Sequence, residues 1–129
     1  MNYYFDKTLT TSFDNAVELI KQSLPNIGFG VVTEFDVDKK LNEKLGVDFR
    51  KYKVIGACNP KYAYEALQIE PMIGTMLPCN IIVQEIEPNK ILIAAIDPVA
   101  SMQAVENPKL NEAANAIKEI LEKFIFDLK

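Results

Sequence analysis

Two neighbouring segments of this chain are apolar at almost every position, and only a short turn separates them. The segments cover residues 79–86 and 91–96, and the turn is Glu87-Pro-Asn-Lys90. So short a connection between two strands favours an antiparallel hairpin. Strands that are apolar on both sides need cover on both faces. The sequence therefore predicts a sheet whose central hairpin is covered on both sides.

The rest of the chain alternates between strand-like and helix-like patterns. Apolar residues have helical spacing from Phe13 to Leu24 and from Leu110 to Phe124, and Asn59-Pro60 is typical of a helix cap and first turn. Shorter patterns predict strands over residues 3–9, 28–37 and 51–58, and a polar helix over 37–46. The predicted order is β-α-β-α-β-α-β-β-α. It indicates an α+β fold, one domain over residues 1–129, with a mostly antiparallel five-stranded sheet and helices packed on it.

Charged residues interrupt two of the predicted strands. In the first strand, Lys7 lies on the same side as the apolar Phe5 and Leu9. In residues 28–37, one side carries Phe29, Val31, Phe35 and Val37, and the other carries Glu34 and Asp36. We expect both strands to be half-buried, with one face in the core and one face in polar surroundings.

The sheet also bears on the oligomeric state. If the helices lie on one face of the sheet, the apolar residues of the hairpin leave the other face uncovered. An uncovered apolar sheet face is a candidate dimer surface. We therefore expect a homodimer.

Composition excludes several classes of function. The chain has no histidine, so neither a Ser-His-Asp or Cys-His catalytic pair nor a His-ligated zinc ion is available. The net charge is -4 and Arg50 is the only arginine, which argues against nucleic acid as a partner. No segment has the length of a membrane span, and the amino terminus does not resemble a signal peptide. We expect a cytoplasmic protein with no membrane partner, whose thiols are kept reduced.

The two cysteines occur in similar surroundings. Cys58 is followed by Asn59 and Pro60, whereas Cys79 follows Pro78 and precedes Asn80. Cys58 lies at the predicted end of one strand, and Cys79 begins another. If these strands are neighbours, the two sulfur atoms meet at one end of the sheet.

Such a meeting allows three kinds of site, next to a purely structural role. Two thiolates bind a soft metal ion, with methionine sulfur as a further ligand; the candidates are Met72, Met76 and Met102. Alternatively, Cys58 is a nucleophile that Cys79 resolves. In the third case the thiols, Asn59 and Asn80 line a small-molecule pocket. In the purely structural alternative, the two cysteines only pack as small buried apolar residues. The chain is then an interaction module.

Several motifs together resemble a known family. They are Gly28-Phe29, Ile55-Gly-Ala-Cys-Asn-Pro60 with Ala63 and Leu67, Leu77-Pro-Cys-Asn80, and Asp97-Pro98 with Met102. In this order and spacing, over residues 3–125, they resemble the prokaryotic family named domain of unknown function 302. The resemblance implies a small α+β fold with an antiparallel sheet that tends to form dimers, and it implies no activity. The family's recurring motif falls on Cys58, Asn59, Pro60, Leu77, Pro78, Cys79 and Asn80.

The sequence thus favours a binding or accessory domain over an enzyme. Its ligand is a small molecule or a soft metal ion, and the expected ligand-binding residues are Cys58, Asn59, Cys79 and Asn80. The two cysteines are the expected metal ligands. The sequence identifies no cofactor.

Overall fold

The computed structural model describes residues 2–129 and contains one five-stranded sheet. The strands occur in the order β1-β5-β4-β3-β2, and every neighbouring pair is antiparallel. Their bounds are Tyr4–Thr10 (β1), Gly30–Asp36 (β2), Tyr52–Cys58 (β3), Cys79–Glu87 (β4) and Lys90–Ile96 (β5). The α+β class and the antiparallel five-stranded sheet are confirmed.

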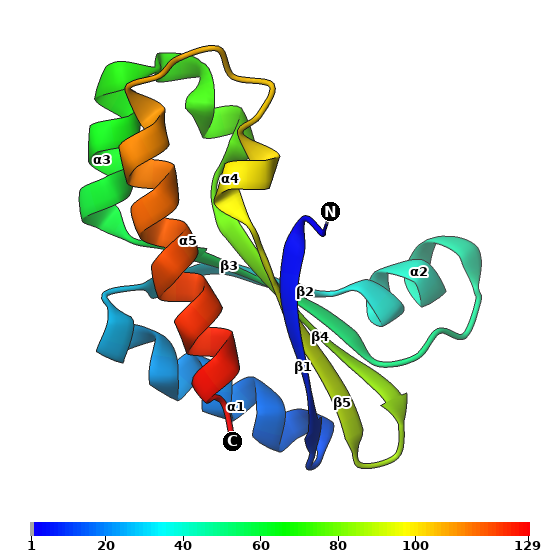
Figure 1. The fold of residues 1–129 in the computed structure, drawn as a ribbon. Helices are drawn as coiled ribbons and strands as arrows, with labels where there is room; N and C mark the ends of the chain where they lie inside the picture. Colours follow the sequence, from blue (N-terminus) through cyan, green and yellow to red (C-terminus); the bar gives the residue numbers. More distant parts are fainter. Residues whose placement is uncertain (1) are drawn as a thin grey trace.

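Within the described residues, five α-helices and two 3-10 helices connect and cover the strands. The α-helices are α1 (Phe13–Ser23), α2 (Val37–Leu45), α3 (Pro60–Ile69), α4 (Pro98–Ser101) and α5 (Leu110–Asp127), and the 3-10 helices are η1 (Leu24–Ile27) and η2 (Pro71–Met76). Figure 1 shows α1, α3 and α5 grouped on one side of the sheet, with α2 standing apart from them. The short α4 lies in the connection between β5 and α5, and the Asp97 side chain caps it by accepting a hydrogen bond from the backbone amide of Val99.

The predicted hairpin forms the centre of the sheet. Only Pro88 and Asn89 separate β4 from β5, and Asn89 has a left-handed backbone with φ 64°. Alternate residues of the two strands are fully buried under α1 and α5, among them Ile81, Val83, Ile91 and Ile93. The residues between them, such as Ile82 and Leu92, are only half-buried. Helices of this chain therefore cover one face of the hairpin.

The long helices follow from their apolar stripes. In α1, Phe13, Ala16, Val17 and Ile20 are buried, and the Ser12 hydroxyl accepts a hydrogen bond from the Asn15 amide at 3.1 Å. In α5, six residues of the apolar stripe are buried: Leu110, Ala114, Ile117, Leu121, Phe124 and Ile125. None of the described helices is both long enough and apolar enough to cross a membrane.

One face assignment in β2 is wrong. The register of β2 against β3 shifts between Val31 and Thr33, so the side-chain alternation reverses there. Glu34 and Asp36 consequently share the helix-covered side with Val31. Phe35 points to the opposite face and stays 46% exposed. A bulge of this kind leaves no mark on the apolar pattern, because it depends on the pairing with β3.

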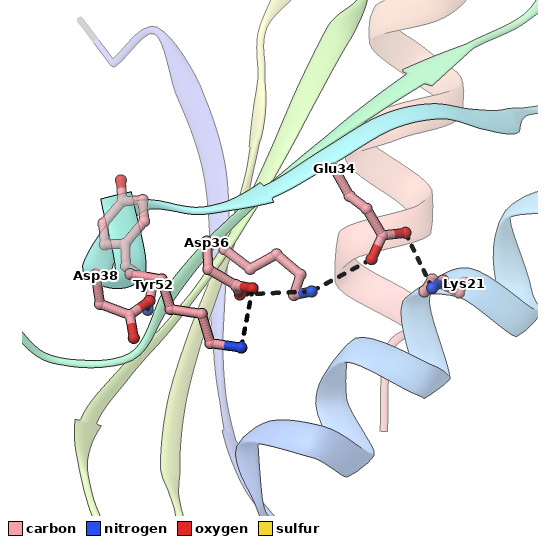
Figure 2. A network of polar contacts seen from close by, with 7 residues as sticks. Lys21, Glu34, Asp36, Asp38 and Tyr52 are labelled. Carbon is pink, nitrogen blue, oxygen red and sulfur yellow. Dashed lines mark hydrogen bonds and ion pairs between the residues drawn. The ribbon is translucent and has the colours of Figure 1, made fainter. Parts of the chain in front are cut away.

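Ion pairs, and not buried apolar side chains, make the main side-chain contacts of residues 34–36 in β2. Lys21 of α1 lies 2.9 Å from Glu34, and Lys53 of β3 lies 3.2 Å from Glu34 and 3.4 Å from Asp36 (Figure 2). The hydrogen bond from Lys21, together with Lys53, lowers the pKa of Glu34 despite some desolvation. Asp38 of α2 also accepts a hydrogen bond from the Tyr52 amide at 3.2 Å. The network therefore connects α1 and α2 to this edge of the sheet.

Candidate functional site

The sheet brings the two cysteines to the same end. Cys58 is the last residue of β3, and Cys79 is the first residue of β4. In the register of these strands, Cys79 pairs with Ala57, the neighbour of Cys58. Both thiols are free and half-buried. The two strands are neighbours, so both cysteines lie at the same end of the sheet.

Small side chains leave a cavity beside the two thiols. Helices α3 and α5 pack against each other here, and they present four alanines to the space between them: Ala63, Ala66, Ala113 and Ala114. Tyr62, Leu77, Leu110 and Ile117 are among the other residues that line it. The cavity holds about 40 Å³. We call it the thiol cavity; it is open to both Cys58 and Cys79.

The other candidate residues lie at different distances from this cavity. Asn59 lines it and also caps α3, because its side-chain oxygen accepts a hydrogen bond from the Tyr62 amide at 3.4 Å. Asn80 is exposed and lies on the opposite face of the sheet, since side chains alternate along β4. Three of the four expected ligand-binding residues are therefore brought together, and Asn80 is not.

Only one of the candidate methionines is placed at the cavity. Met102, which follows α4, lines it. Met72 and Met76 belong to η2, where they are 71% and 36% exposed and outside the cavity wall. The sulfur-containing residues that line the cavity are therefore Cys58, Cys79 and Met102.

The surroundings of Cys79 favour its neutral form. Burial raises the pKa of the Cys79 thiol to about 11, and the nearby charge of Cys58 adds to the effect. At neutral pH, Cys79 is a protonated thiol in an apolar wall. A positively charged ligand that compensates the lost proton would reverse this preference.

The donor set restricts the ions that the cavity can hold. Nowhere in residues 2–129 do three His, Cys, Asp or Glu side chains converge. A structural zinc site requires four such ligands, and a calcium site requires six to eight oxygens. Two thiolates with one thioether suit a soft ion of low coordination number, such as copper(I).

Sequence patterns gave no indication of the alanine walls. Ala113 and Ala114 lie on the apolar stripe of α5, where the sequence indicates core packing. The available signal was the size of these residues, because small residues on two facing helices leave space between them. That signal becomes visible only once α3 and α5 are known to be neighbours.

Comparison with known families and solved structures identifies the family of this chain. The family described as domain of unknown function DUF302 matches residues 5–128. The chain belongs to this family. A crystal structure of an uncharacterized conserved DUF302 protein from Bacillus stearothermophilus is similar to this DUF302 chain, with a TM-score of 0.90 and 28% sequence identity, and each chain is covered to 100%. No curated protein matches this DUF302 chain. The expected family and fold are thus confirmed, and neither comparison assigns an activity.

Proposed function

We propose that this DUF302 chain is a binding domain that holds a soft metal ion of the copper(I) type in the thiol cavity. The observation that carries the proposal is the shared wall, in which Cys58, Cys79 and Met102 line one small space. Thiolate and thioether sulfur are the protein ligands that select such ions. The two cysteines are the primary ligands, and Met102 is the third.

The size of the cavity favours an ion over an organic ligand. Its volume is about 40 Å³. Pockets for drug-sized molecules hold roughly 300–1,000 Å³. One water molecule accounts for about 30 Å³ of liquid. The space therefore suits a single ion with its sulfur ligands, and an organic ligand would require α3 and α5 to separate.

A thiol enzyme is the competing function. It would use Cys58 as nucleophile and Cys79 to resolve the product. Attack by a thiolate requires a lowered pKa. The raised pKa of Cys79, near 11, makes it a poor resolving group at neutral pH. Metal binding therefore agrees better with the cavity than the chemistry of a thiol enzyme does.

The proposal is tested by titrating the reduced protein with copper(I) against a chromogenic copper(I) chelator. We expect one equivalent to bind. Cys58→Ser and Cys79→Ser should each abolish competition with the chelator, and Met102→Leu should weaken it. Met72→Leu is the matched control, because the Met72 side chain is 71% exposed and outside the cavity. Circular dichroism of each variant separates loss of binding from loss of fold.

Two results would contradict metal binding. One is wild-type protein that does not compete for copper(I) although its thiols are free. The other is binding that survives both serine substitutions. Rapid alkylation of Cys58 near neutral pH would instead support the thiol enzyme. Destabilised serine variants with no ligand at any condition would support structural cysteines.

We further infer a cytoplasmic location for the binding domain. Support comes from the free thiols, since a reducing compartment keeps Cys58 and Cys79 available as ligands. Cell fractionation with an antibody to the chain tests this inference, and recovery in an extracellular fraction would contradict it.

A further inference from the structure

The face of the sheet that α1 and α5 do not cover is low in charge. We call it the open face. Its central rows contain Thr8, Leu92 and Gln84, and next to them Ala94, Ile82 and Val54, as the strand registers place them. Asp6 is the one charged residue in these rows. Gln84 is 9% exposed, and its side-chain oxygen accepts a hydrogen bond from Arg50. Loss of charge at the centre of an otherwise charged surface is typical of a protein interface.

A groove runs along the open face. It holds about 430 Å³, its floor includes Ile82, Leu92 and Ala94, and its rim includes Tyr3, Tyr4 and Asp6. Tyrosines at the rim of an apolar groove are common in interfaces, where the ring is buried and the hydroxyl stays accessible.

A projecting pair of side chains lies beside this groove. The segment that follows α2 carries Phe49, which is 40% exposed, and Arg50. The Arg50 guanidinium lies 4.4 Å from the centre of the Phe49 ring, and its Nε donates to the Gln84 side-chain oxygen at 2.9 Å. These contacts hold the Phe49–Arg50 pair over the open face. Arginine and aromatic residues are the side chains that most often anchor interfaces.

The open face is complementary to itself in charge. Asp6 lies on β1, and Arg50 donates a hydrogen bond to Gln84 of β4. Because β5 lies between β1 and β4, it separates the acidic from the basic side chain. Consider a two-fold axis that lies between two such faces and parallel to β5. It would place the β1 side of each copy opposite the β4 side of the other. It would bring Asp6 of each copy to the Arg50 side of the other copy. Closed homodimers have such self-complementary interfaces.

We propose that two copies of this chain associate through their open faces, with the Phe49–Arg50 pair of each copy in the groove of the other, next to Asp6. The two sheets then pack face to face about 10 Å apart, as in aligned sheet packing. The proposal gives the homodimer expected from the sequence a specific surface. It is independent of metal binding, because the groove and the thiol cavity lie on opposite faces of the sheet.

The test measures self-association by sedimentation velocity over a range of micromolar concentrations. We expect the wild type at twice its chain mass of 14.5 kDa. Asp6→Arg and Arg50→Glu should each weaken the dimer by about tenfold or more, because each places like charges opposite one another. The double variant Asp6→Arg/Arg50→Glu should regain affinity. A rescue of this kind cannot come from misfolding.

A second pair of variants tests the apolar floor. Leu92→Glu should abolish the dimer, while Leu67→Glu should retain it, because Leu67 is 40% exposed on α3 and away from the open face. Circular dichroism checks that both fold. Three results would overturn the proposal: a monomeric wild type, a dimer that Leu92→Glu leaves intact, or single charge variants that the double variant does not rescue. A monomer that carries a small molecule in its native mass spectrum would also overturn it.

Discussion

The side-chain amine of Lys7 donates a hydrogen bond to the backbone carbonyl of Phe126, with 2.7 Å between the two atoms. The same amine also donates to the carbonyl of Leu128. Lys7 lies on the helix-covered side of β1, and the two carbonyls belong to the end of α5 and the residues after it. A lysine at this place satisfies carbonyls that have no partner within the helix. Lys7 thereby connects the last turn of α5 to β1.

Replacing Lys7 with methionine should destabilise the protein. Methionine keeps the apolar stem and loses both hydrogen bonds, so the free energy of unfolding should fall by about 1–2 kcal/mol. Urea denaturation measures the change. Lys123→Met is the control, because the Lys123 side chain is 80% exposed and forms an ion pair with the nearby Asp127 of the same helix. An equal loss in both variants would show that the contact at the end of α5 is not special.

The Glu34 ion pairs should make stability depend on acid pH. The folded pKa of Glu34 lies below its ordinary value of 4.5. The ion pairs therefore contribute fully above pH 4.5, and the contribution disappears as the pH falls through the folded pKa. Because Glu34 is partly exposed, we expect Glu34→Gln to cost about 0.5–1 kcal/mol at neutral pH, and almost nothing in strong acid.

Urea denaturation of wild type and Glu34→Gln at several pH values checks this expectation. Glu43→Gln is the control, since the Glu43 side chain is 63% exposed and lies 3.7 Å from Lys40. It should show no comparable pH dependence. A Glu34→Gln deficit that persists in strong acid would contradict the ion-pair explanation.

Gly56 should tolerate no side chain. A Cβ atom there would lie 2.5 Å from the Thr33 hydroxyl oxygen and 2.6 Å from Cγ of Pro78. Because the Pro78 ring cannot rotate away, we expect Gly56→Ala to cost about 1–3 kcal/mol. Gly30→Ala is the matched control, since nothing lies within 4 Å of its Cβ position. Thermal unfolding compares the two. If both variants melt alike, the contact with Pro78 does not restrict residue 56.

The Cys79 thiol should react slowly and at high pH. Its pKa of about 11 predicts an alkylation rate that still rises tenfold per pH unit above pH 9. The Cys58→Ser variant isolates this thiol, and the shift should largely remain because burial is its main cause. Mass spectrometry after timed alkylation gives the rate, with the unfolded chain as reference. A folded rate that levels off at the same pH as the unfolded chain would show that Cys79 is not buried.

Local patterns predicted the elements well, because the signals involved are local. The hairpin over β4 and β5 follows from its apolar runs and its short turn, and the cap at Asn59 follows from two adjacent residues. Lys7 shows the limit of this reasoning. In the sequence it only interrupts an apolar side, because its partner carbonyls lie at the other end of the chain.

The candidate site was predictable in part for the same reason. Cys58 and Cys79 each lie at a strand end, and a local pattern shows that. In the sequence Asn80 follows Cys79 just as Asn59 follows Cys58, yet Asn59 lines the cavity and Asn80 lies on the opposite face of the sheet. The alternation along β4 separates Asn80 from Cys79, while the cap of α3 turns Asn59 towards the cavity.

By itself, the sequence determined the family, the succession of strands and helices, and the absence of histidine chemistry. These depend on residue identity and on periodicity over a few neighbours. Only the tertiary structure decided that α3 and α5 meet at their alanines, that a bulge reverses β2, and that one face of the sheet stays open. Each of these depends on which distant segments pair, because packing and register are set by contacts across the whole chain.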